Sequence, residues 1–156
     1  MKGEKMEKTK RPGVLTALAV INFIIAFLYI VITGLTAVSL VFINSIPLDN
    51  LGEAEAARIE AIGQLSAGES VFMVGPTLIA GILLLLAGIG YLKQKKTLGW
   101  VMGNAYAAVM ILQTIISPII LPPALKGGTV SIIIALAYPI ITLILINFVY
   151  KKNLVH

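Results

Sequence analysis

Four long runs of apolar residues, each free of charged side chains, constrain this chain more than any other feature of its sequence. They cover about residues 14–43, 71–92, 98–121 and 129–150. A helix of about 20 apolar residues crosses the hydrocarbon core of a bilayer, which is about 30 Å thick. Each run is long enough to cross once, so the sequence predicts an all-α protein built as a four-helix transmembrane bundle.

The composition agrees with a membrane protein and argues against a water-soluble domain. Hydrophobic residues make up 58% of the 156 residues, and charged residues make up only 12%. Soluble domains are roughly half apolar and about a quarter charged. A soluble fold of this length has no means of hiding so much apolar surface. We therefore expect the lipid bilayer to be the main partner of the chain.

The basic residues predict how the helices are directed across the membrane. All but two of the 12 lysines and arginines fall in the N-terminal segment 1–13, in the connection between the second and third runs, or in the C-terminal segment 151–156. Only Arg58 and Lys126 fall in the other connections. Short loops rich in Lys and Arg stay in the cytoplasm. We expect a protein of the cell membrane with both termini in the cytoplasm.

Three aromatic residues stand at ends of runs that this topology places on the cytoplasmic side. They are Tyr91, Trp100 and Tyr150. Amphipathic rings prefer the headgroup layer of a membrane. We therefore expect these three side chains to lie at the membrane surface.

Residues 44–70 form the only sizeable segment predicted outside the membrane. Asn50 and Glu53 fit a capping box, apolar residues from 51 to 65 fall loosely on one helical stripe, and Gly68 offers a stop. This pattern predicts a short amphipathic helix on the external surface. The stripe could dock a partner or lipid headgroups, or it could pack on the helix ends as a lid. We favour the lid.

Small residues recur at helical spacing in two of the runs. Gly99, Gly103 and Ala107 follow one another in steps of four, and Gly81 and Gly88 lie one heptad apart. Helices in lipid associate through close packing of such small residues. The faces they define fit contacts within the monomer, a homo-oligomer or a membrane protein partner. We favour contacts within the monomer.

Four amide side chains fall inside the predicted spans: Asn22, Asn104, Gln113 and Asn147. Buried amides suit hydrogen bonds between helices, worth on average about 0.6 kcal/mol each. They could instead line a narrow path for a small neutral molecule. We favour hydrogen bonding between helices.

Pro139 falls in the middle of the fourth run and is expected to kink it. A proline lacks an N–H and leaves the carbonyl four residues earlier, that of Ala135, without its helical donor. Gln113 lies at the same depth as Ala135 when each is counted from its cytoplasmic helix end. We predict that the Gln113 amide donates to this carbonyl, with Thr77 as the competing donor.

The sequence predicts no catalysis, no metal site and no cofactor; Glu53, Glu55 and Glu60 could form a weak cation site outside the membrane, but we favour a solvated helix face. The four runs contain no Asp, Glu, Lys, Arg or His, the single histidine is His156, and there is no cysteine. Membrane enzymes need a nucleophile, an acid–base pair or a metal cluster, and proton-coupled transporters usually carry ionisable residues within their spans. Basic residues flank apolar runs without interleaved aromatics, which argues against nucleic acid.

Residues 11–19 read RPGVLTALA, and a Lys-rich turn followed by Trp100 separates the second and third runs. In these features the chain resembles small prokaryotic four-helix integral membrane proteins of unknown function. The resemblance implies the same four-helix architecture and supplies no active-site residues. We expect a non-catalytic membrane component that acts as an accessory, scaffold or partner-binding protein. The alternative is an oligomeric channel or carrier for a small solute or lipid.

Overall fold

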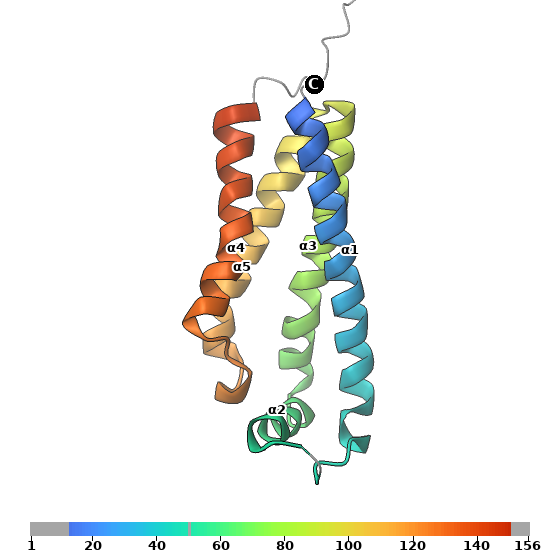
Figure 1. The fold of residues 1–156 in the computed structure, drawn as a ribbon, viewed down its shortest axis with the longest axis vertical. Coiled ribbons are helices and arrows are strands. Elements are labelled where there is room, and N and C mark those ends of the chain that lie inside the picture. Colours follow the sequence, from blue (N-terminus) through green and yellow to red (C-terminus); the bar gives the residue numbers. More distant parts are fainter. Residues whose placement is uncertain (1–12, 50, 151–156) are drawn as a thin grey trace, which may run out of the picture.

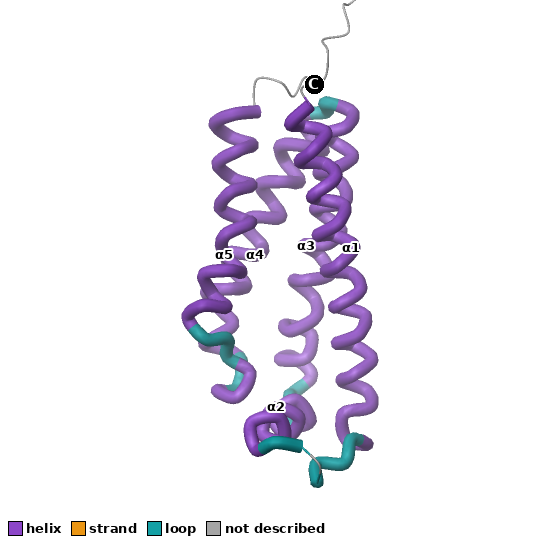
Figure 2. The backbone as a smooth tube through the Cα atoms, viewed as in Figure 1, coloured by secondary structure: helices purple, strands orange, loops and turns teal. Residues whose placement is uncertain are grey.

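The computed structural model describes residues 13–49 and 51–150, and in this part of the chain all regular structure is helical, without β-strands (Figures 1 and 2). Within these described ranges, four helical spans are long and apolar enough to cross a membrane, which confirms the predicted all-α four-helix bundle and supports a multi-pass membrane protein. The long helices are α1 (Gly13–Phe42), α3 (Ala67–Lys93), α4 (Met102–Ile120) and α5 (Thr129–Ile144).

Short segments complete the chain. A helix, α2 (Glu53–Gly63), lies between α1 and α3, and two 3-10 turns follow α1 and α4. Wider π-helical turns precede α4 and follow α5. These four segments are η1 (Ile43–Ser45), η3 (Pro123–Leu125), η2 (Thr97–Val101) and η4 (Leu145–Tyr150).

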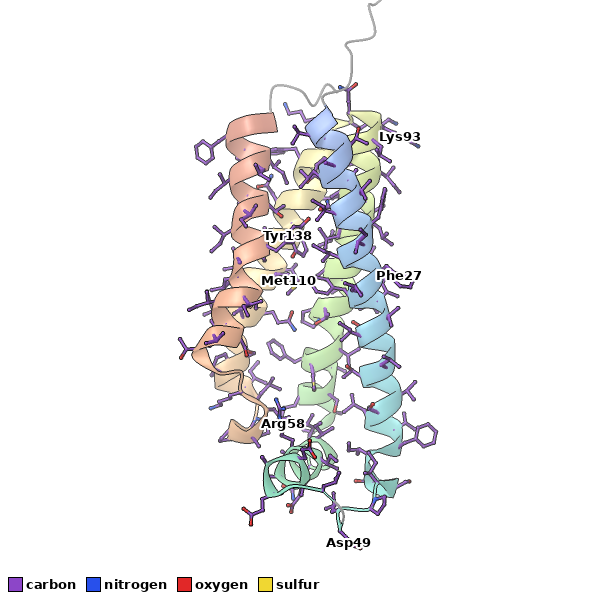
Figure 3. The ribbon with its side chains drawn as sticks, viewed as in Figure 1. Phe27, Asp49, Arg58, Lys93, Met110 and Tyr138 are labelled. Atoms are coloured by element: carbon purple, nitrogen blue, oxygen red, sulfur yellow. The ribbon has the colours of Figure 1, made fainter. Side chains whose placement is uncertain are left out.

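The four long helices pack in a chain of neighbours rather than a closed ring. α1 packs along α3, α3 along α4, and α4 along α5 (Figure 1). We call the end where α3 stops at Lys93 the lysine end, and the opposite end, near Asp49, the α2 end (Figure 3). Side chains of α1 and η4 meet at the lysine end, where Leu15 and Ile146 share one buried cluster. The main helix contacts of α5 are with α4.

α3 begins at Ala67, earlier than the expected residue 71, because a capping box starts it. The Ser66 backbone N–H donates to a carboxylate oxygen of Glu69 at 2.8 Å, and the Glu69 N–H donates to the Ser66 hydroxyl at 3.3 Å. These bonds satisfy donors that a helix otherwise leaves unpaired at its N-terminus. Gly68, expected to stop the preceding helix, therefore lies inside α3.

The short helix α2 exists as predicted, but its cap differs. Gly52 is the N-cap and makes no side-chain capping bond, so the proposed box of Asn50 and Glu53 is wrong; Asn50 itself lies outside the described residues. α2 contacts both η1 and η3 and so bridges the ends of the two helix pairs. None of its residues is fully buried.

The turn from α3 to η2 brings two backbones into direct contact. Gln94 adopts the left-handed conformation at φ 52°, and the Lys95 N–H donates to the Gly90 carbonyl at 2.9 Å. The returning segment then crosses Gly90 so closely that a Cβ there would lie 2.1 Å from the Gly99 nitrogen. Only glycine fits at position 90.

The outer surface of the bundle is apolar, as a lipid-facing surface must be. Phe148 is 86% exposed and Ile119 81% exposed, and Phe27 points outward from α1 (Figure 3). In water such a surface would be a large aggregation liability. In a bilayer this apolar surface faces lipid chains that are equally apolar.

Candidate functional site

The glycines singled out from the sequence all contact helices of the same chain. A Cβ on Gly81 would lie 3.2 Å from Ile30, and one on Gly88 would lie 2.8 Å from the Phe23 ring. Both glycines therefore admit α1 close to α3. Such close approach is the usual basis of helix association in lipid.

The third-span residues line the other side of α3. Gly99 is buried in the π-helical turn η2, against Gly90. A Cβ on Gly103 would lie 2.4 Å from both the Tyr91 hydroxyl and Ile146, and Ala107 is fully buried. Gly103 thus makes room for the Tyr91 side chain, which sequence reasoning had placed at the membrane surface. Tyr91 is instead 0% exposed, and its ring belongs to the buried cluster at the lysine end.

Two of the predicted amides form one polar network near the lysine end. The Trp100 indole N–H donates to the Asn147 side-chain oxygen at 2.8 Å. The Asn147 amide nitrogen donates to the Asn104 side-chain oxygen at 2.7 Å, and the Asn104 amide donates to the Trp100 carbonyl at 2.7 Å. This network ties η4 to η2 and α4. Trp100, expected at the headgroups, is thereby part of the connection between helices.

Replacing Asn147 by leucine is expected to lower the free energy of unfolding by about 1–2 kcal/mol, because it removes a donor and an acceptor from this network. Thr36→Val is the control, since the exposed Thr36 hydroxyl donates only to the Ile32 carbonyl of its own helix. Thermal unfolding in detergent measures both. Equal melting temperatures for the two variants would show that the network contributes nothing to stability.

Three tyrosines fill the middle of the bundle. The ring centroids of Tyr29 and Tyr106 lie 6.4 Å apart, and those of Tyr106 and Tyr138 lie 6.0 Å apart, both in tilted geometry. The Tyr138 hydroxyl donates to the Asn22 side-chain oxygen, which joins α5 to α1. Tilted aromatic pairs at this distance are favourable beyond their buried area. We call Tyr29, Tyr106 and Tyr138 the tyrosine layer.

The predicted pairing of Gln113 with Ala135 is wrong. The Gln113 amide nitrogen donates to the Thr77 hydroxyl at 3.2 Å, so the residue expected to compete is the partner. The α-helix of α5 continues through Pro139 without a break, and π-helical turns begin only at Leu145. Because α4 packs along α3 as well as along α5, Gln113 can reach across to either helix.

A cavity of about 250 Å³ lies between α3, α4 and α5, on the α2 side of the tyrosine layer. Met110 lines it, and in Figure 3 Met110 and Tyr138 lie in the interior between α5 and α3. None of its lining residues is charged. The polar side chains that line it are Thr77, Gln113, Thr114, Ser117 and Ser131.

Packed side chains lie between the cavity and the lysine end. On α4, Tyr106 lies one helical turn from Met110, on the side of the lysine end. On α5, Tyr138 lies about one turn from Ala135, also on the side of the lysine end. Tyr106 is 0% exposed and sits in a buried cluster with Leu84. The tyrosine layer therefore lies beyond Met110 and Ala135, between the cavity and the lysine end, although its three side chains do not line the cavity themselves.

The chemistry that this arrangement offers is hydrogen bonding without charge. Among the described residues, no group of three or more His, Cys, Asp or Glu side chains is placed to hold a metal ion. The polar part of the lining consists of four hydroxyls and one amide. These groups donate and accept hydrogen bonds but do not ionise near neutral pH. The sequence indicates Gln113 as a buried amide, whereas it favours packing or hydrogen bonds to helix carbonyls for Ser117 and Ser131, because their place at the cavity depends on how α4 and α5 face α3.

Comparison of the chain with protein-family models, with curated proteins and with solved structures gave no match.

Proposed function

We propose that this protein is a non-catalytic, multi-pass component of the cell membrane that acts as an accessory protein by binding another molecule in the cavity between α3, α4 and α5. The observation that carries the proposal is a cavity whose uncharged lining combines apolar side chains with the polar side chains of Thr77, Gln113, Thr114, Ser117 and Ser131. One polar atom of this lining, the Gln113 side-chain oxygen, is buried without a hydrogen-bond partner, and such an atom is costly unless a bound molecule satisfies it. Enzymatic chemistry is disfavoured because the spans lack the acids, bases and nucleophile pairs that it needs.

A channel or carrier for a small neutral solute is the second candidate. The same polar lining supports it, because conduction requires groups that replace the hydration of the solute. The tyrosine layer argues against it, since its three side chains occupy the route from the cavity to the lysine end. We therefore favour binding over passage.

Mass spectrometry of the protein released intact from membranes tests the proposal. Wild type should carry a bound molecule that survives gentle detergent removal, and Ala135→Phe should lose it, because Ala135 lines the cavity and a phenyl ring would fill it. Ala137→Phe is the matched control on the exposed side of α5. Equal occupancy in Ala135→Phe and wild type, or no bound molecule in any of them, would contradict binding in the cavity.

The orientation we propose places the lysine end in the cytoplasm and α2 outside. It is supported by the distribution of basic residues described above. A reporter fused after His156 should register as cytoplasmic, and a reporter inserted near Gly63, at the end of α2, should register as external. Finding both reporters on one side of the membrane would be incompatible with four crossings.

A further inference from the structure

We infer that the cavity binds the headgroup of a neutral glycerolipid with free hydroxyls, while its acyl chain lies in the surrounding bilayer. This inference rests on the proposed function and names the class of ligand. The argument uses the hydrogen-bonding groups of the cavity, its size and the sides on which it is open.

The free hydrogen-bonding groups of the cavity match hydroxyls. The Gln113 amide nitrogen is used by Thr77, and the Thr114 hydroxyl donates to the Met110 carbonyl at 2.8 Å. The hydroxyls of Ser117 and Ser131, which face the same cavity from α4 and α5, make no hydrogen bond to any described residue. A hydroxyl both donates and accepts, so ligand hydroxyls would satisfy these serines.

A charged headgroup does not suit this cavity. Its lining contains no lysine, arginine, aspartate or glutamate. Burying a carboxylate, phosphate or ammonium without a countercharge costs far more than burying a neutral hydroxyl that finds partners. Fatty acids and phospholipids are therefore disfavoured, and neutral polyol esters are favoured.

The volume fits a headgroup and not a whole lipid. The cavity measures about 250 Å³ and is only partly enclosed. That space accommodates a glycerol ester but no long acyl chain. Met73 and Met110, together with Phe72, supply an adaptable apolar lining where the chain would begin.

The sides of the cavity favour access from the bilayer rather than from water. At the α2 end, helix α2 reaches η3 and so spans the ends of both helix pairs (Figures 1 and 2). The main helix contacts of α5 are with α4, and the cavity lies between α5 and α3. A lipid can therefore present its headgroup between α3 and α5 and leave its chain among the other lipids.

Thermal unfolding of delipidated protein in detergent tests the inference with three probes. 1-Monooleoylglycerol should raise the melting temperature saturably, whereas oleate, with the same chain and a charged head, and glycerol, with the head alone, should not. Ser117→Ala should raise the monooleoylglycerol concentration needed for half of the shift about tenfold, because one hydrogen bond is lost. Ala135→Phe should abolish it, and Ala137→Phe should leave it unchanged.

Each other outcome overturns a defined part of the inference. An equal shift with oleate would refute the neutral headgroup, and an equal shift with glycerol would refute the lipid as the source. A monooleoylglycerol shift that persists in Ala135→Phe would show that the lipid acts elsewhere. If mass spectrometry shows a cavity-dependent occupant but monooleoylglycerol has no effect, the ligand class is wrong while the proposed function stands. Ser117→Ala keeps the test informative if Ala135→Phe does not fold.

Discussion

Gly90→Ala is expected to lower the free energy of unfolding by about 3 kcal/mol, near the upper end for an overpacked site. The added Cβ would lie 2.1 Å from the Gly99 nitrogen and 2.3 Å from the Leu98 carbonyl carbon. Both are backbone atoms, so no side-chain rotation relieves the clash. The turn at the lysine end would have to move away from α3. Thermal unfolding in detergent measures the loss as a lower melting temperature.

Two other glycines provide graded controls for this substitution. Gly34→Ala should be neutral or slightly stabilising, because a Cβ there meets nothing within 4 Å and alanine is the better helix former. Gly88→Ala should fall between the two, since its Cβ would meet the Phe23 ring at 2.8 Å and a ring can shift. If Gly90→Ala melted at the same temperature as Gly34→Ala, the close contact of α3 with η2 would not exist in the protein.

Tyr106→Ala is the second substitution with a large expected effect, a loss of about 3 kcal/mol. Tyr106 is fully buried and contacts both other members of the tyrosine layer. Removing its ring leaves a void at the centre of the bundle, between α1, α3 and α5. Unfolding in detergent should again report the loss.

Tyr106→Phe separates the ring from its hydroxyl. The hydroxyl makes only a long contact of 3.4 Å with the Tyr29 hydroxyl. Its removal should therefore cost roughly 0.5 kcal/mol. Tyr106→Phe and Tyr106→Ala losing equal stability would mean that the hydroxyl, and not packing of the ring, holds the layer together.

The fold could be predicted from the sequence because the number of spans depends on hydropathy averaged over about 20 residues. Four uncharged runs predict four helices, and this number does not depend on which helices pack together. The small residues Gly81, Gly88 and Gly103 mark close contacts because only such residues allow backbones to approach in lipid. The spacing Ser-x-x-Glu of Ser66 and Glu69 also stands in the sequence, but the prediction did not use it and began this helix at residue 71.

The candidate site could be predicted only in part, because it depends on helix rotation. Gln113 was recognised as a buried amide, yet its partner Thr77 and not Ala135 follows from the direction in which α4 turns this side chain. Tyr91 and Trp100 were assigned to the membrane surface by their place at helix ends. Both instead pack against other helices, Tyr91 over Gly103 and Trp100 against Asn147. Hydropathy alone does not distinguish an aromatic ring facing headgroups from one facing a neighbouring helix.

The permeability of vesicles to glycerol tests most directly whether the cavity binds without conducting. Vesicles containing the purified wild-type protein are exposed to a glycerol gradient, and their volume is followed by stopped-flow light scattering. We expect the same glycerol permeability as in protein-free vesicles, because the packed tyrosine layer lies between the cavity and the lysine end. A higher permeability that Ala135→Phe removes and Ala137→Phe retains would contradict this and establish a path through the bundle.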